Sequence, residues 1–459
     1  MEKFWKENRD RKIVVYQHLV LSFLEGNGYR NIKLNGIWKI ARFNNHIIDF
    51  IEDTIEVRRF LIDHIKSYGE LFGKEQVLEQ TLKLFCNIKK SGLLDGLKQA
   101  ELNLLENNHK ETYKFFKEKV VKITPESISF LDYKDLSGNV LRSTIIDREL
   151  EIFSETAIWR SDFPVFLFRC MNEDEQRFHN LLGILGYLSS GYKSRKDDKA
   201  VVFCDGLIEG LPEGGTGKSL TATALHHFNN TVIEDGKTFK FTNFTFQQVT
   251  YGTELLIIDD ANKRLNFENL FASITGGFQI EKKYQDKQTL SFEDSPKILI
   301  TTNYTIYGKG YSFERRIIEV EFSDYYGRFR KPLDDFKKEF FNSWGKAEWS
   351  LFFHFMLKCV QHYLRCNELH EISINDPIQK RLIRETTIDF FNFISEADLH
   401  GYIRKSVLYD EFLDEFPEYK KWLSIRKFNG WIKDYCITMK IEFYESKMEG
   451  GKRCWVFQK

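Results

Sequence analysis

The stretch LPEGGTGKSL, residues 211–220, decides the fold and the first functional interpretation. Glycines let backbone N–H groups converge on phosphate oxygens, and a helix that follows adds the positive end of its dipole. In such a loop Lys218 reaches the terminal phosphates and Ser219 binds Mg²⁺. We therefore predict a site for ATP and Mg²⁺ rather than a plain glycine-rich surface turn. The predicted phosphate loop consists of Gly214, Gly215, Thr216, Gly217, Lys218 and Ser219.

The entry to this loop departs from the usual pattern. The G-x-x-x-x-G-K-[ST] spacing requires glycine at position 212, where this chain has Pro212, and Gly210 stands two residues earlier. The connection from the apolar run VVFC to Lys218 is also longer than in a tight strand–loop–helix unit. We expect an irregular first turn above an intact phosphate cradle.

Three short apolar runs, KAVVFCD (199–205), TELLIID (253–259) and SPKILITTN (295–303), are separated by helical or polar segments. Such alternation is typical of a parallel α/β core. A helical face precedes the first run, and LLIIDD ends the second with two acidic side chains. The fold class predicted for the centre of the chain is a P-loop ATPase core built on a parallel sheet. The residues of the helical face are Phe178, Leu181, Leu182, Leu185 and Leu188.

Polar side chains at the ends of these strands suit nucleotide hydrolysis. Asp259 is predicted to hold the Mg²⁺ shell, and Asp260 to orient or deprotonate the attacking water. Asn303, which ends the third run, is predicted to sense the γ-phosphate, although many asparagines only turn the chain at a strand end. Arg315 and Arg316 open the strand RRIIEVEF, and a guanidinium there can stabilise charge on a neighbouring subunit's phosphate. Arg316 is preferred for that role, and surface ion pairing is the alternative.

Between the acidic strand and Asn303, residues 275–294 form two alternating runs, predicted to pair as a hairpin around Asp286 and Lys287. Lysines beside an aromatic side chain suit a nucleic-acid backbone with a stacking face. A solvated charged hairpin is the equal alternative. The lysines assigned to DNA are Lys282, Lys283 and Lys287.

The flanks of the core suggest two further units. Residues 1–160 mix helical and strand patterns and predict an α+β accessory region, with a hairpin turning at Asn44–Asn45. Residues 161–375 are assigned to the ATPase core with helical flanks. Residues 376–459 read as three helices followed by two strands around Gly450–Gly451, an order that fits a winged helix.

Composition limits the partners. The chain has 67 basic and 67 acidic residues among 459, so any contact with a polyanion must be local. Seven scattered cysteines indicate reduced thiols in a cytosolic compartment. The charged N-terminus and the lack of an apolar run of about 20 residues predict no membrane partner. We expect a cytoplasmic location, in a bacterial host.

Taken in order, GGTGKS, IIDD, ITGGFQIEKKY, ILITTN and RRIIEVEF resemble the motifs of superfamily 3 helicases, and more closely the ATPase half of phage, plasmid and poxvirus-type primase-helicases. The resemblance runs from about residue 110 to the C-terminus. It implies an AAA+ type core, a hexameric ring with arginine fingers acting across subunits, and hairpins that draw one DNA strand through a channel. Lys283 matches the lysine of the family's DNA-contacting segment. Primase activity does not carry over, because residues 1–160 lack a convincing pair of catalytic carboxylates.

The leading hypothesis is an ATP-dependent helicase that acts as a ring on single-stranded or forked DNA during replication of a phage, plasmid or other mobile element. A separate primase or other replication proteins are possible partners. The alternatives are an AAA+ ATPase that remodels a protein and an origin-binding protein gated by nucleotide. A small-molecule kinase fits less well, because kinases of the P-loop class lack the asparagine strand followed by an arginine-led strand.

Overall fold

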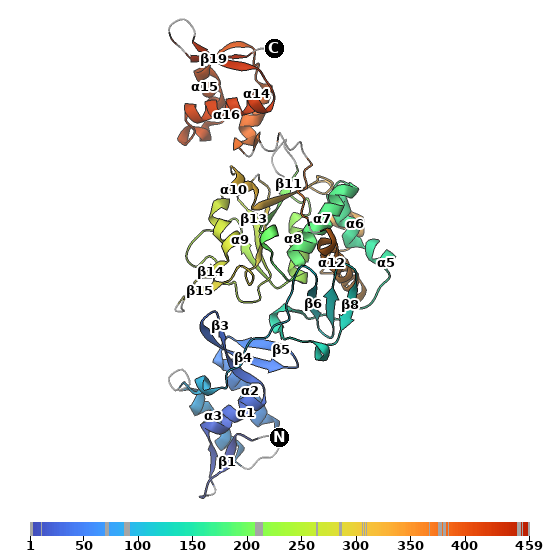
Figure 1. Ribbon diagram of the computed structural model, residues 1–459, viewed down its shortest axis with the longest axis vertical. Coiled ribbons are helices and arrows are strands. Elements are labelled where there is room, and N and C mark those ends of the chain that lie inside the picture. Colours follow the sequence, from blue (N-terminus) through green and yellow to red (C-terminus); the bar gives the residue numbers. More distant parts are fainter. Residues whose placement is uncertain are drawn as a thin grey trace.

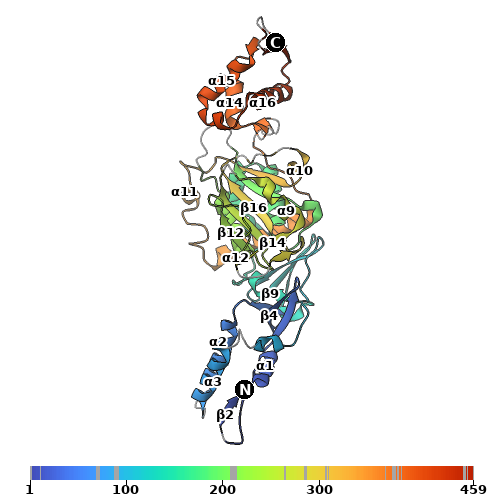
Figure 2. The same ribbon diagram turned by 90° about the vertical axis from the view of Figure 1, so that its left-hand side faces the viewer.

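The chain forms an elongated molecule with the parallel-sheet core in the middle and smaller units at either end (Figures 1 and 2). The computed structural model describes residues 3–10, 12–68, 73–86, 92–206, 214–262, 265–283, 287–304, 306, 308, 310–366, 368–374, 379, 382–383, 385–447, 451 and 453–457. Within these ranges, no helix combines the length and apolar character needed to span a bilayer.

The N-terminal unit packs helices and a small sheet around its own apolar cluster. Its sheet has the order β3-β4-β5-β9. A second sheet, in the order β10-β6-β7-β8, packs against the core: Phe116, Val121 and Ile123 share its main apolar cluster. The elements are β1 (Trp5–Glu7), β2 (Ile13–Val15), α1 (Gln17–Gly26), β3 (Tyr29–Leu34), β4 (Ile37–Asn44), β5 (Ile47–Ile51), α2 (Thr54–Ser67), α3 (Lys74–Cys86), β6 (Thr112–Phe116), β7 (Val120–Ile123), β8 (Ile128–Leu131), β9 (Val140–Leu141) and β10 (Ile145–Ile146).

The hairpin predicted in this region is present, but its turn lies one residue later than the sequence suggested. β4 continues through Asn44, and Asn45 and His46 occupy the two turn positions with φ of 46° and 65°. A two-residue hairpin whose central residues both have positive φ matches the right-handed twist of the strands, and asparagine tolerates that conformation. The turn is therefore Asn45–His46, not Asn44–Asn45.

The core is a parallel sheet with helices on both faces, as the sequence predicted, and its strand order is β12-β13-β16-β11-β17. Each neighbouring pair is parallel. Its elements are α5 (Glu155–Trp159), α6 (Asp162–Cys170), α7 (Glu175–Ser189), β11 (Ala200–Asp205), α8 (Lys218–Phe228), β12 (Thr231–Asp235), β13 (Leu255–Ala261), α9 (Phe271–Gly276), β14 (Phe278–Ile280), β15 (Gln288–Leu290), β16 (Lys297–Thr302), α10 (Tyr311–Glu314), β17 (Ile317–Phe322), α11 (Pro332–Phe336) and α12 (Lys346–Cys366).

Side chains of β11 alternate between the two faces of this sheet. Val201 and Phe203 join the cluster formed with α7, α8 and α12, whereas Val202 and Cys204 join the cluster formed with α9 and the β14–β15 hairpin. The sequence pattern of α7 predicts one apolar face, yet every residue from Leu181 to Ser189 is buried. The helix is covered on several sides because it lies between the sheet and α12 (Figure 1).

The C-terminal unit has its own apolar cluster and an antiparallel sheet in the order β18-β20-β19. The sequence missed β18, because GYIR is a four-residue strand that is visible only through its pairing with β20. The turn expected at Gly450–Gly451 includes a residue outside the described ranges. The elements are α14 (Ile388–Glu396), β18 (Gly401–Arg404), α15 (Lys405–Glu415), α16 (Ile425–Thr438), β19 (Phe443–Lys447) and β20 (Arg453–Phe457).

Candidate nucleotide site

The glycine loop leads from β11 into α8, at the carboxyl edge of the parallel sheet. Gly214, Gly215 and Gly217 all have left-handed φ, at 68°, 82° and 104°. A Cβ on Gly217 would lie 2.8 Å from both Cys170 Sγ and Phe166 Cζ. Glycine is thus required at 217 by conformation and by space, so that α8 can begin directly at Lys218. Pro212 lies outside the described residues.

Strand order also favours this edge as a binding site. β11 lies between β16 and β17, while the chain leaving it returns as β12 at the far side of the sheet. Ligands of open α/β sheets bind outside the carboxyl ends of the strands where the direction of connection changes. The loop and α8 start at such a point.

Lys218 is buried against an acidic partner that the sequence did not single out. Its Nζ donates to Asp205 Oδ1 and to Thr216 Oγ1, the latter at 3.0 Å. The Thr216 hydroxyl also donates to Asp205 Oδ1, at 2.7 Å, and the other carboxylate oxygen, Oδ2, is buried with no partner among the described residues. The sequence feature that could have identified Asp205 is its position as the acidic residue at the end of the apolar run VVFCD.

Ser219 and Asp259 are brought together as predicted for metal ligands. Ser219 Oγ donates to Asp259 Oδ1 at 3.2 Å, across the gap between α8 and the end of β13. Thr301 supports this carboxylate: its hydroxyl donates to Asp259 Oδ1 at 2.5 Å and accepts from the backbone N–H of Asp260 at 2.8 Å. Thr301 was not among the predicted residues, since ILITTN singles out no threonine by pattern alone.

Asp260 has a different partner from Asp259. It has φ of 56°, and the pairing of β13 with β16 shifts register between Ile258 and Ala261. A bulge and a left-handed residue at a strand end often re-aim a functional side chain. The Asp260 carboxylate lies 2.6 Å from Lys237 Nζ, and this hydrogen bond raises the pKa of Lys237. The two aspartates therefore face different groups.

Asn303 follows β16 beside the loop. A Cβ placed on Gly214 would lie 4.0 Å from its amide nitrogen Nδ2. An amide at this distance from the loop can donate to a terminal phosphate or hold a water. Below the loop, burial raises the pKa of the Cys170 thiol, with Lys218 opposing the shift, and the thiol donates to Thr216 O at 3.4 Å.

The two predicted arginines lie elsewhere. Arg315 and Arg316 precede β17, and the Arg316 carbonyl accepts from Ala200 N at 2.8 Å, at the amino edge of the sheet. Asp205 is five positions further along β11, about 17 Å at the usual rise per residue. The Arg316 guanidinium donates to Ser312 O at 2.7 Å and lies 4.7 Å from the Phe271 ring, whereas Arg315 is exposed. Neither side chain reaches the loop of its own chain.

The predicted lysines lie on the connection between β14 and β15, which pair antiparallel as expected. Lys283 and Lys287 are exposed and Lys282 is half-buried. Residues 284–286, including the predicted stacking residue Tyr284 and the expected turn at Asp286, lie outside the described ranges.

The donor set at the carboxyl edge fits ATP with Mg²⁺. Hydroxyl and carboxylate oxygens from Ser219 and Asp259 are the ligands that Mg²⁺ prefers, and it retains waters and phosphate oxygens in its other positions. Lys218 is the buried cation, and the left-handed glycines leave backbone N–H groups free of side-chain obstruction. The fit to ATP and Mg²⁺ is judged from these side chains and loop N–H groups.

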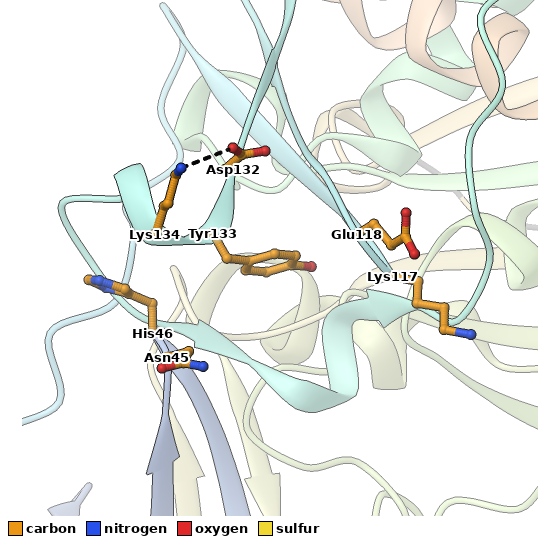
Figure 3. Close-up of a pocket in the computed structure, with 7 residues that line it drawn as sticks. All are labelled: Asn45, His46, Lys117, Glu118, Asp132, Tyr133 and Lys134. Carbon is orange, nitrogen blue, oxygen red and sulfur yellow. Dashed lines mark ion pairs between the residues drawn. The ribbon is translucent and has the colours of Figure 1, made fainter.

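A separate open cavity lies where the β4–β5 turn meets the second sheet (Figure 3). The Asp132 carboxylate in its lining lies 3.7 Å from Lys134 Nζ and also pairs, at 2.5 Å, with Lys119 outside the lining. Burial raises the pKa of Tyr133 to about 12, and its hydroxyl donates to Phe116 O at 2.6 Å. None of the residues predicted for catalysis lines it. The lining residues are Asn45, His46, Lys117, Glu118, Asp132, Tyr133 and Lys134.

Comparison with known proteins gives weak likenesses only. No family model matches the chain, and a search of curated proteins finds no match. The A form apo structure of the NrS-1 C-terminal region is 12% identical with a TM-score of 0.43, covering 96% of this chain and 99% of that one. A second apo structure of this region has 12% identity, a TM-score of 0.40 and coverage of 96% and 98%. JCV helicase with a bound thiazolopyridine compound has 12% identity and a TM-score of 0.26, covering 62% and 66%. Because these TM-scores lie below 0.5, the functional argument rests on the geometry of the chain itself.

Proposed function

We propose that this chain is an ATP-dependent DNA helicase or translocase of the superfamily 3 type, which works as a ring oligomer on single-stranded or forked DNA. The observation that carries the proposal is the pairing of Ser219 Oγ with Asp259 Oδ1, at 3.2 Å, beside a left-handed glycine loop. A glycine-rich surface turn has no reason to place a metal-ligand pair across the carboxyl edge of a parallel sheet.

The residues of the loop bind and orient the nucleotide. When bound, Mg²⁺ neutralises charge on the phosphates during transfer to water. Lys218 moves from Asp205 to the phosphates, because both are anions that compete for one ammonium group. Thr301 orients the Asp259 carboxylate by donating a hydrogen bond to its Oδ1. Asp260, which pairs with Lys237 at 2.6 Å, and Asn303, which lies beside the loop, are the residues proposed to orient a water.

The position of the arginines favours an assembly. Since Arg315 and Arg316 lie at the opposite edge of the sheet from the loop, an arginine finger in this protein must come from a second copy. Arg315 is exposed, so it is at least as suitable as Arg316, whose guanidinium is engaged with Ser312 and Phe271. A hexamer is the proposed ring, and hydrolysis then requires neighbouring subunits.

The DNA contacts are proposed for the β14–β15 hairpin, through Lys282, Lys283 and Lys287. The C-terminal unit supports a second contact with DNA or with a replication protein: helix, strand, two helices and two strands follow one another there, as in a winged helix. On α16, Lys433 pairs with Glu445 at 2.5 Å, which leaves Arg426 as the better candidate for a phosphate contact.

Steady-state ATP hydrolysis with and without single-stranded DNA tests the proposal, at stated salt because phosphate contacts are salt-sensitive. We expect DNA to stimulate the wild type, and Lys218→Ala and Ser219→Ala to lower turnover by at least about 100-fold. Ser219→Ala is included because it removes a metal ligand without leaving the buried Asp205 unpaired. Lys283→Ala should keep basal turnover and lose the stimulation.

The matched control is Lys83→Ala, an exposed lysine on α3 that pairs with Glu79. It should behave like the wild type in both conditions. Brisk hydrolysis that ignores DNA in every variant would overturn the helicase proposal and favour remodelling of a protein partner. Nucleotide binding without any turnover would favour the origin-binding alternative.

A further inference from the structure

Helices α7 and α12 pack antiparallel and unusually close. A Cβ on Gly186 would lie 2.0 Å from the Cys359 carbonyl oxygen, and one on Gly183 would lie 3.8 Å from the His362 ring. Two glycines on α7 thus let the backbones approach one another. At the end of this contact, Cys366 Sγ lies within hydrogen-bonding distance of the His362 ring, at 3.5 Å from Nε2.

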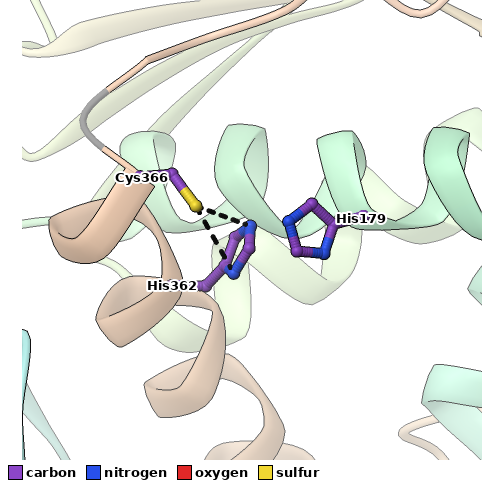
Figure 4. Close-up of side chains that lie close together, drawn as sticks. All are labelled: His179, His362 and Cys366. Atoms are coloured by element: carbon purple, nitrogen blue, oxygen red, sulfur yellow. Dashed lines mark hydrogen bonds between the residues drawn. The ribbon is translucent and has the colours of Figure 1, made fainter.

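Three metal-ligating side chains meet there (Figure 4). His362 and Cys366 are four residues apart, hence on one face of α12, and His179 comes from α7. Cys366 Sγ lies 3.5 Å from His362 Nε2, and the two imidazole centres are 4.2 Å apart at an interplanar angle of 85°. One ligand atom from each residue can be chosen so that all lie within 4.8 Å of one another.

We propose that His179, His362 and Cys366 form a binding site for a zinc-like divalent cation, with water in the fourth position. One thiolate and two imidazole nitrogens form a ligand set that zinc and cobalt prefer over magnesium or calcium. The site is separate from the phosphate loop and does not depend on the proposed helicase activity.

The geometry requires only small side-chain movement. Bonds of about 2.0 to 2.3 Å in a tetrahedron place ligand atoms about 3.4 to 3.6 Å from one another. The Cys366–His362 separation already has this value, and any other separation must close by at most about 1.3 Å, which rotation of an exposed side chain provides. His179 and Cys366 are exposed and His362 is half-buried, so an ion can enter from solvent.

The charges around the cluster act in opposite directions. The carboxyl end of α12, where Cys366 lies, carries the negative end of the helix dipole, which favours a cation. The adjacent Arg365 brings a positive charge close to His362, although its Nε donates to Pro125 O at 2.5 Å.

Among the six cysteines whose side chains the structure describes, Cys366 is the exposed one. Cys170, Cys204, Cys359, Cys436 and Cys454 are all buried, whereas Cys366 is exposed. An exposed thiol beside two imidazoles is poorly explained by packing. A bound ion would fasten the last turn of α12 to α7 and so stabilise the helical layer that supports the sheet.

Cobalt titration of the full, reduced and untagged chain tests the site. We expect about one Co²⁺ per chain, with visible bands of tetrahedral cobalt and a near-ultraviolet band from thiolate charge transfer, all displaced by Zn²⁺. Zn²⁺ should also raise the thermal midpoint, since an ion that binds only the folded state stabilises it. Cys366→Ser should lose the charge-transfer band, and His179→Gln should weaken binding at least about tenfold.

Both variants change exposed side chains, so their folding should match the wild type in metal-free thermal unfolding. The matched control is His400→Gln, an exposed histidine 3.6 Å from the Asp398 carboxylate, which should bind Co²⁺ unchanged. Octahedral spectra only, or a charge-transfer band that survives Cys366→Ser, would overturn the site. Equal binding by His179→Gln and the wild type would also overturn it.

Discussion

Two edges of the same sheet bury lysines, and the way in which each lysine is satisfied differs. At the carboxyl edge Lys218 contacts Asp205 and Thr216, and one Asp205 oxygen is left buried without a partner among the described residues. At the amino edge Lys297 donates to Ser190 O at 2.5 Å and to its hydroxyl at 2.9 Å. Nearby, Lys114 donates to Asn229 Oδ1 at 2.9 Å and Glu254 Oε1 at 2.8 Å.

The difference shows that burial alone does not identify a functional lysine. Lys297 is bound by backbone and side-chain oxygens of a fixed helix end, and burial lowers its pKa well below the usual value. Lys218 is bound by a strand-end carboxylate and by a threonine of the loop itself, which an incoming phosphate can replace. The amino-edge lysines have partners that suit a structural role, whereas the partners of Lys218 suit the exchange for phosphate that we propose.

Among substitutions that test the difference between the two edges, Lys114→Met is expected to change the free energy of unfolding most. Removing one partner of a buried ion pair leaves the other charge uncompensated, so we expect a loss of about 3 kcal/mol in the free energy of unfolding. ATP turnover per folded molecule should stay within about twofold of the wild type, because an amino-edge residue does not contact nucleotide. Urea unfolding and hydrolysis measure the two quantities.

The double variant Lys114→Met with Glu254→Gln is the control for this effect. It should recover part of the lost stability, since no lone charge remains buried. A loss of turnover with unchanged stability in Lys114→Met would contradict the division between the two edges.

A smaller effect is expected from Asp205→Asn. The neutral amide no longer competes with phosphate for Lys218, so nucleotide should bind about tenfold more tightly, a gain of about 1.4 kcal/mol. Calorimetric titration with a non-hydrolysable ATP analogue measures this. Asp235→Asn, at the end of β12, which two strands separate from β11 in the sheet order, is the control and should not change affinity. Weaker binding by Asp205→Asn would mean that Asp205 orients Lys218 for the nucleotide instead of competing for it.

The smallest effect concerns pH at the amino edge. Burial lowers the pKa of Lys193 to about 8, and its Nζ donates to Ser295 Oγ at 2.9 Å. Between pH 8 and about 10.4 the unfolded chain binds more protons at this lysine than the folded chain, so stability rises with pH across that window. We expect Lys193→Gln to lose about 1 kcal/mol of this rise, allowing for partial exposure. Urea unfolding at a series of pH values measures it, and identical slopes in both proteins would contradict the assignment.

Much of the fold could be predicted from local pattern. The runs KAVVFCD, TELLIID and SPKILITTN became β11, β13 and β16, because uninterrupted apolar residues suit strands that are buried on both faces. The loop glycines and the acidic strand end were also visible, since each depends on neighbours in the chain. β18 was missed and the β4–β5 turn was misplaced by one residue, because strand pairing and turn conformation set those limits.

Local sequence thus specified the residue types at the candidate nucleotide site: loop glycines, a lysine, a hydroxyl and acidic strand ends. Which of these side chains meet depended on the fold. The connection from β11 into α8 set Asp205 against Lys218, and the pairing of β13 with β16 set Thr301 against Asp259. The pairing of β11 with β17 placed Arg315 and Arg316 at the opposite edge. Packing of α7 on α12 joined His179 to His362. The physical reason is that local preferences act over a few residues, whereas these contacts join residues from about 10 to more than 180 positions apart.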